Sequence, residues 1–148
     1  MGLFSKVDKV LASSKNLKVM ERTSADKNIE EQINNAGIQK FAESDYGDIY
    51  VRTDELGGFL ILETLIVSVT NFKSKKGSKL TFYNDDESLA FESDEAKIES
   101  DFSGVSNRYV TKIDYNIEAE QIAILEEKRH TNARFEINGK EIIFSTIK

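Results

Sequence analysis

The chain contains no cysteine, no proline and no tryptophan among its 148 residues. Without cysteine there can be no disulfide, thiolate metal site, thiol nucleophile or thiol redox switch. Without proline every residue keeps its backbone N–H, so turns must be formed by Gly, Asn, Asp and Ser. Because the absence of cysteine favours a reducing compartment, we expect a cytoplasmic protein.

Long apolar runs are also missing. The longest are FLIL at 59–62 and LIV at 65–67, far short of the roughly 20 apolar residues that span a membrane. The first residues, MGLFSKVDKVLASSK, lack the apolar block of a signal peptide. The net charge of −6 and the pI near 4.9 oppose attraction to nucleic acid or anionic lipid. We therefore expect neither a membrane nor a nucleic acid as partner.

Signatures of catalysis and of metal binding are absent from the sequence. The single histidine, His130, follows a predicted helix, where we expect a surface or capping role rather than that of a general base. The segment KKGSK at 75–79 lacks the first glycine and the strand–loop–helix order of a phosphate loop. The acidic residues between 85 and 95 lack the ligand spacing of a calcium loop. We therefore predict no catalytic residue, no metal and no cofactor.

The N-terminal third favours helices. Apolar residues at helical spacing predict an amphipathic helix over 3–12, which could pack on the core, dock a partner or lie on a membrane surface. A short strand is predicted at 17–21, and a second helix at 26–36, ended by Gly37.

From residue 48 the apolar period changes to two, which predicts strands at 48–54, 59–72, 79–83, 88–92, 96–102 and 107–117. The strand 59–72 is apolar on both faces and is therefore expected at the centre, where Glu63 would be costly unless paired. Short polar connections predict a meander of antiparallel hairpins. The residues expected to point inward are Leu80, Phe82, Leu89, Phe91, Ile98, Phe102, Tyr109, Ile113 and Tyr115.

The C-terminal part predicts a helix and a hairpin. Residues 118–129 read as a helix capped by Asn116, with Lys128 and Arg129 at its negative end. Strands at 133–137 and 140–147 follow, joined at Asn138–Gly139. The predicted fold class is α+β in a single domain, 1–148. It comprises an antiparallel β-meander sheet, able to curl into a half-barrel, with an N-terminal amphipathic helix and a C-terminal helix followed by a β-hairpin.

The run FKSKKGSKLTFYNDDESLAFESDE at 72–95 is basic at its start and acidic at its end. Successive turns of a meander lie at opposite ends of a sheet, so the basic turn should share its end with residues 92–95, and Asn84–Glu87 should lie at the other. The lysines could balance Asp94 and Glu95 or could bind a partner. The candidate partner-binding residues are Lys73, Lys75, Lys76 and Lys79.

Three function classes remain open. The preferred prediction is a non-catalytic cytoplasmic protein-interaction module, such as an acidic inhibitor or immunity-type protein for a basic partner. The alternative is a small β-rich domain that binds an apolar ligand in a cavity lined by Phe and Tyr. An enzyme is the least expected. A large exposed apolar patch or an uncovered edge strand would favour the first class.

Overall fold

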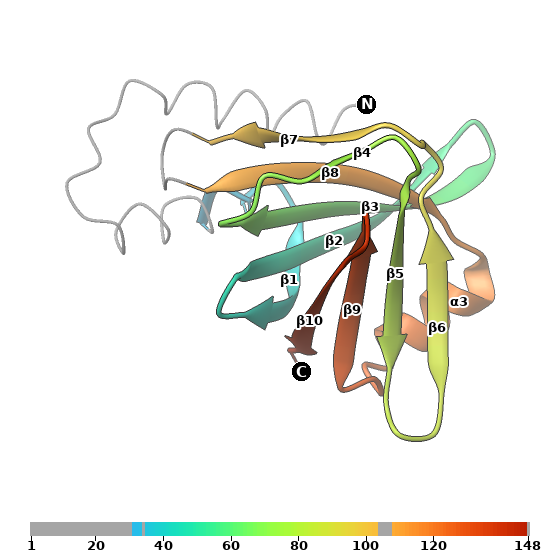
Figure 1. Cartoon of the computed structure of the whole chain (residues 1–148). Helices are drawn as coiled ribbons and strands as arrows, with labels where there is room; N and C mark the ends of the chain where they lie inside the picture. Colours follow the sequence, from blue (N-terminus) through green and yellow to red (C-terminus); the bar gives the residue numbers. More distant parts are fainter. Residues whose placement is uncertain (1–30, 34, 104–107, 148) are drawn as a thin grey trace.

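The structure is a computed structural model that describes residues 31–33, 35–103 and 108–147 (Figure 1). Residues 31–33 and 35 are helical, and almost all other regular structure is β-strand. The elements are β1 (Gln39–Ser44), β2 (Gly47–Leu56), β3 (Phe59–Ser68), β4 (Lys73–Ser74), β5 (Ser78–Tyr83), β6 (Ser88–Glu92), β7 (Ile98–Phe102), β8 (Tyr109–Asn116), α3 (Ala119–Glu126), β9 (Asn132–Ile137) and β10 (Lys140–Thr146).

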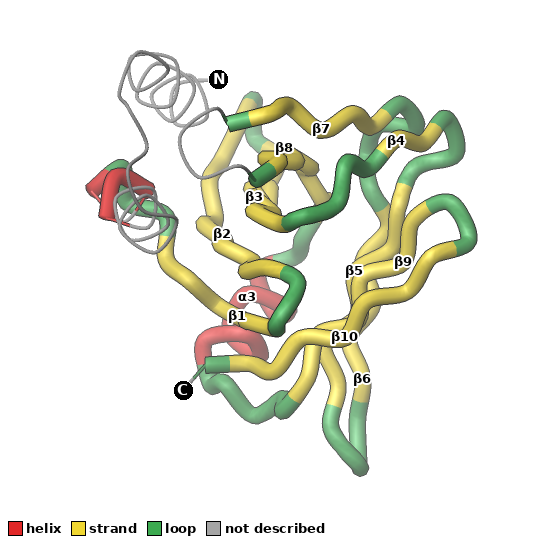
Figure 2. The backbone as a smooth tube through the Cα atoms, turned by 60° about the vertical axis from the view of Figure 1, so that its left-hand side comes forward, coloured by secondary structure: helices red, strands yellow, loops and turns green. Residues whose placement is uncertain are grey.

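The strands form one antiparallel sheet in the order β4-β7-β8-β3-β2-β1-β10-β9-β5-β6. The sheet curls into a half-barrel, and α3 lies across one opening of it (Figure 2). Near one end of β6 the curl brings the sheet back onto itself: Ser93 forms a bridge with Tyr115, and the Asp94 N–H donates to Asp114 O at 3.1 Å. The half-barrel is thus joined at one end of β6 and open along the rest of that strand.

Strand β3 is buried on both faces, as its sequence predicts. Leu62 and Ile66 belong to the core inside the half-barrel. Leu65 and Val67 belong to a second cluster on the outer face, together with Ile33 from the helical segment. This strand is central because it pairs with β2 on one side and with β8 on the other.

Aromatic side chains fill the inside of the half-barrel by packing on one another. The rings of Phe72 and Phe135 meet edge to face at 5.2 Å between centroids, and those of Phe41 and Phe82 meet at the same distance. Helix α3 contributes Leu125 to this core. The interior is therefore a packed core, whose burial supplies the main stabilising term of the fold.

The predicted meander is wrong at its centre. The hairpins β5–β6 and β7–β8 form, but β6 does not continue into a ladder with β7. Strand β5 pairs instead with β9, and β7 with β4. The five residues between β6 and β7 look like a hairpin connection in the sequence, yet they carry the chain across the junction of the half-barrel.

Several local predictions are corrected as well. Strand β1 was not expected; its pairing with β2 shifts register between Lys40 and Ala42. Phe102, expected inside, is 48% exposed and stacks against Tyr109 at 5.3 Å, because the end of β7 extends beyond the core. The helix begins after Glu118, and the Asn116 amide, expected to cap it, donates to Asp94 instead.

The N-terminal predictions are tested only in part. The helix at 3–12 and the strand at 17–21 lie outside the described residues. Of the helix predicted at 26–36, residues 31–33 and 35 are helical. Gly37 has φ of +86° and the Ile38 N–H donates to Ile33 O, a left-handed helix end of the kind that glycine favours. The predicted end of this helix is therefore confirmed.

Candidate functional site

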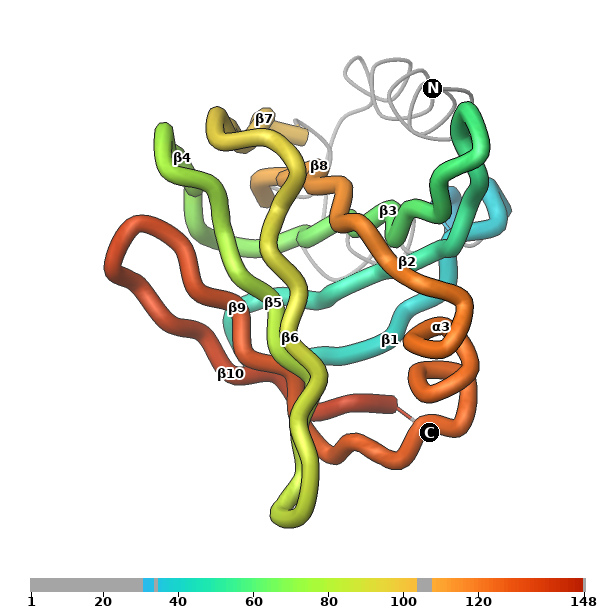
Figure 3. Tube along the Cα trace, turned by 90° about the vertical axis from the view of Figure 1, so that its right-hand side faces the viewer, coloured from blue at the N-terminus to red at the C-terminus, as the bar shows by residue number. Residues whose placement is uncertain are grey.

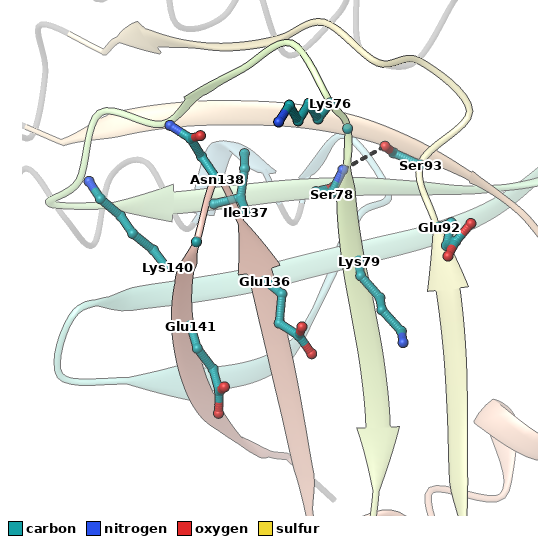
Figure 4. A pocket seen from close by; sticks show the side chains of 12 residues that line it. Lys76, Ser78, Lys79, Glu92, Ser93, Glu136, Ile137, Asn138, Lys140 and Glu141 are labelled. Atoms are coloured by element: carbon teal, nitrogen blue, oxygen red, sulfur yellow. Dashed lines mark hydrogen bonds between the residues drawn. The ribbon is translucent and has the colours of Figure 1, made fainter.

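The four lysines singled out in the sequence gather at one end of the sheet. Lys73 lies in β4, Lys75 and Lys76 in the following turn, and Lys79 in β5. They line two neighbouring hollows of about 570 and 350 Å³. Figure 4 shows the larger one, where Lys76 and Lys79 lie beside the β9–β10 hairpin.

The basic turn lies where the topology argument predicts. The Gly77 N–H donates to Ala96 O at 2.6 Å, and the Ser78 N–H donates to Ser93 Oγ at 2.9 Å (Figure 4). The turn Asn84–Glu87 lies at the opposite end of the same hairpin. The prediction that the basic turn shares its end with residues 92–95 is therefore confirmed.

Charge at this lysine end is close to balanced. Lys79 stands opposite Glu92 on one side and opposite Glu136 on the other. Lys73 stands opposite Glu99, whose carboxylate also lies 3.7 Å from the Lys97 ammonium. Cross-strand pairs of opposite charge stabilise a sheet modestly and leave little net field for an anion.

A third hollow is lined by residues of β6, of the tip of the β2–β3 hairpin and of the start of α3. The backbone of these elements is drawn in Figure 3. It has a volume of about 770 Å³ and is called the acidic cleft below. Seven of its twelve lining residues are apolar, and three of the other five carry carboxylates. The lining residues are Leu56, Phe59, Leu60, Ile61, Ala90, Phe91, Glu92, Asp94, Asn116, Ile117, Glu118 and Gln121.

The β2–β3 turn explains the exposed apolar part of the acidic cleft. Gly57 and Gly58 have φ of +58° and +86°, a conformation that a two-residue hairpin turn requires and glycine adopts without strain. The turn pairs Leu56 with Phe59 at the tip, where the side chains are 38% and 71% exposed. Leu56 and Phe59 thus form an exposed apolar pair at one side of the acidic cleft.

The polar side chains of the acidic cleft are held by local contacts. The Asn116 amide donates to an Asp94 carboxylate oxygen at 3.3 Å. The Gln121 side-chain oxygen accepts from the Glu118 N–H at 2.8 Å, which helps to begin α3. Among the described residues, no lysine or arginine lines the cleft. The charged side chains of its described lining are therefore all acidic, in contrast to those of the lysine end.

Glu63 and Asp114 form a separate pair of carboxyl groups on the outer face of the sheet. They stand opposite each other on β3 and β8. Each has one buried oxygen without a hydrogen-bond partner. Burial raises the pKa of Glu63, as do the Asp54 and Asp114 carboxylates, while Arg52 opposes the rise. The pKa of Asp114 is raised by burial and by Asp94 and Glu95. The sequence identified Glu63 as the residue to inspect, and it is buried as expected.

His130 is not the surface residue that the sequence suggested. Its side chain is only 3% exposed and lies near the ring of Phe82. Burial lowers the pKa of the imidazole, while Glu87, 3.8 Å away, opposes the shift. The Glu87 carboxylate also forms an ion pair with Arg129, at 3.1 Å from its Nε. Arg129 was expected to interact with the negative end of the helix dipole, and it pairs with this carboxylate instead. His130 is therefore a buried residue that lies against Phe82.

Sequence reasoning missed the acidic cleft because its parts come from three separate stretches of the chain, 56–61, 90–94 and 116–121. The available signal was the apolar pair Leu56 and Phe59 around Gly57–Gly58, since apolar residues at a hairpin tip cannot reach the core.

In the part of the chain that the structure describes, no three His, Asp or Glu side chains gather as a metal site. No helix within the described ranges is long and apolar enough to cross a membrane.

Comparisons of the chain with protein-family models, with curated proteins and with solved structures each give no match.

Proposed function

We propose that the protein is a non-catalytic protein-interaction module that binds a basic protein partner, as an acidic inhibitor or immunity-type protein would. The observation that carries the proposal is the acidic cleft, where an exposed apolar hairpin tip adjoins three carboxylates. Because the chain lacks cysteine, we place this role in the cytoplasm as part of the proposal.

The two components of the cleft would contribute differently to binding. Covering a phenylalanine such as Phe59 is worth about 1.5 to 3 kcal/mol, less the entropy of fixing the ring. The carboxylates Glu92, Asp94 and Glu118 would mainly steer a basic partner and exclude acidic ones. Affinity is therefore expected to depend on Phe59, and the association rate on the carboxylates and on salt.

The other function classes have less support. A ligand inside the half-barrel would have to displace aromatic rings that pack edge to face, such as Phe72 and Phe135. For catalysis, the described lining of the acidic cleft includes no histidine, lysine, serine or tyrosine. Its Asp94 carboxylate is already bound by Asn116.

The test is affinity capture from extracts of the native cell with purified protein as bait, at low and at high salt. Captured proteins are identified by mass spectrometry, and binding is then measured with the purified candidate. The variants are Phe59→Ser, the charge reversal Glu92→Lys/Glu118→Lys, and Lys75→Glu/Lys76→Glu as the matched reversal at the lysine end.

We expect a basic partner whose affinity falls at least tenfold with Phe59→Ser and whose association slows with the acidic reversal. The lysine reversal should leave binding intact or strengthen it. If instead only the lysine reversal abolishes binding, the partner contacts Lys73, Lys75, Lys76 and Lys79. The acidic cleft is then not the site, and the proposal fails.

A further inference from the structure

Strand β6 has an edge whose backbone groups point into the acidic cleft. The Ser93 N–H donates to Ser78 O, and the Asn84 N–H donates to Glu87 O. In an antiparallel ladder the bonded pairs alternate, so Leu89 and Phe91 also direct their backbone groups to β5. The N–H and C=O of Ala90 and Glu92 therefore point to the opposite edge, away from β5. Both residues line the acidic cleft.

The free edge has a defined end. At Asp94 the N–H is already taken by Asp114 O, and Ser93 forms the bridge with Tyr115. Between Ser88 and the Glu92 N–H, no strand of the described part of the chain pairs with this edge, because β6 is the last strand of the sheet order. The open stretch is therefore about one short strand long, and unpaired edges of this kind add further strands readily.

We propose that the acidic cleft binds an extended segment of the partner, which adds to β6 as a further strand of the sheet. This inference rests on the proposed function and specifies how the partner is recognised. The added segment would donate to the Ala90 C=O and accept from the Ala90 and Glu92 N–H groups, because the bridge between Ser93 and Tyr115 uses the Glu92 C=O. It would extend the half-barrel toward α3.

Side-chain alternation then sets the chemistry of the segment. Side chains on the inner side of the added strand would face Leu60, Phe91 and Ile117, which belong to the core or pack against it. Valine or isoleucine is therefore preferred at these positions of the segment. Positions on the outer side would lie next to Glu92, whose side chain is exposed, and would take lysine or arginine. The segment is therefore about five residues of alternating basic and β-branched apolar residues.

A second copy of this chain is a less suitable occupant. Pairing of two β6 edges would bring the Glu92 and Asp94 carboxylates of both copies close together in a cleft with no described lysine or arginine. Like charges across neighbouring strands are destabilising. Charge complementarity therefore selects a basic segment from another protein.

The test on the protein uses Ala90→Pro, with Ala90→Val as its matched control. Proline removes the Ala90 N–H, one of the two N–H groups that point into the cleft, and leaves the β5–β6 bonds in place. Proline is also tolerated on edge strands. The probe is the acetylated and amidated peptide Lys-Val-Lys-Val-Lys-Val-Lys, measured by calorimetry. Far-UV circular dichroism and thermal unfolding check that both variants fold.

We expect the wild type and Ala90→Val to bind the peptide, and Ala90→Pro to bind it at least tenfold more weakly. The proline variant loses one hydrogen bond to the peptide, and its ring also obstructs the edge at which the peptide pairs. Two further peptides carry backbone N-methyl groups, one on the central lysines and the other on the central valines. Only one of them should lose binding, because a paired strand directs alternate N–H groups toward β6.

Three results would overturn strand addition. These are no binding of the unmethylated peptide by the wild type, equal binding by Ala90→Pro, and equal binding of both methylated peptides. A concentration-dependent dimer that Ala90→Pro abolishes would show that a second copy occupies the edge, and would also overturn it. If Ala90→Pro has no effect while Phe59→Ser still weakens the captured partner, strand addition fails and the proposed function stands. If neither substitution matters, both fail.

Discussion

Replacing Glu63 with glutamine is expected to stabilise the protein at neutral pH. The Glu63 side chain is 1% exposed, and its Oε2 has no hydrogen-bond partner. Burial raises the pKa of this carboxyl, and the carboxylates of Asp54 and Asp114 raise it further. Arg52, its cross-strand neighbour, opposes the rise without cancelling it. The ionised form is therefore disfavoured in the folded state, and glutamine keeps the shape while removing the charge.

The size of the effect follows from linkage. A carboxyl group whose pKa is higher in the folded than in the unfolded chain binds more protons in the folded state. Its contribution to stability is therefore lost as the pH rises from the ordinary pKa of 4.5 through the raised pKa of the folded state. Each unit of the rise corresponds to about 1.4 kcal/mol at pH values above both. After allowing for an imperfectly bonded amide, we expect Glu63→Gln to gain about 1 to 2 kcal/mol at pH 7.5. The gain should shrink as the pH falls toward the ordinary pKa of 4.5.

Urea unfolding followed by far-UV circular dichroism measures this gain, because the chain has no tryptophan to report by fluorescence. Glu55→Gln is the matched control, since it removes a charge from an exposed position of the same hairpin. The control should change stability by less than about 0.5 kcal/mol. A Glu63→Gln variant that is less stable than the wild type at pH 7.5, or whose difference does not change with pH, would refute the reasoning.

Three further predictions concern other buried groups. Gly47→Ala should destabilise by about 1 to 3 kcal/mol in urea, because an added Cβ would lie 2.3 Å from Val67 O; an unchanged midpoint would contradict this close approach. The pKa of His130 is lowered by burial, so stability should fall as the pH drops below the ordinary value of 6.5; His130→Gln should flatten this decline, and equal slopes would contradict it. Tyr115→Phe should cost about 1 kcal/mol by leaving Ser78 Oγ without its 2.9 Å partner, and adding Ser78→Ala should restore part of the loss in the same unfolding assay.

Periodicity in the sequence predicts most of the strands and the hairpin at Asn138–Gly139, because these depend on neighbouring residues. It misses β1 because the register shift between Lys40 and Ala42 interrupts the alternation. Phe41 and Ala42, which are adjacent in sequence, consequently both contact the inner core. A period-two pattern cannot reveal a strand whose irregularity breaks that period.

Pairing between distant strands is the other part that local patterns do not predict. Strands β6 and β7 are separated by a hairpin-sized connection, yet they lie near opposite ends of the sheet order. The acidic cleft depends on this arrangement, because it forms where β6 meets the exit of β8 and the start of α3. The candidate site could therefore be found from the sequence only in its hairpin tip.

The position of β10 has a consequence for how the chain folds. Among the described strands it alone joins β1 to β9, so it links the ladder β4-β7-β8-β3-β2-β1 to the ladder β9-β5-β6. Its partners in β1 lie roughly 100 residues earlier, and contacts between such distant residues slow folding. During synthesis the β1 edge would stay unpaired until β10 leaves the ribosome. Deletion of 140–147 should therefore leave two ladders in contact only at the junction between β6 and β8, and an aggregating product in place of a shortened but folded protein.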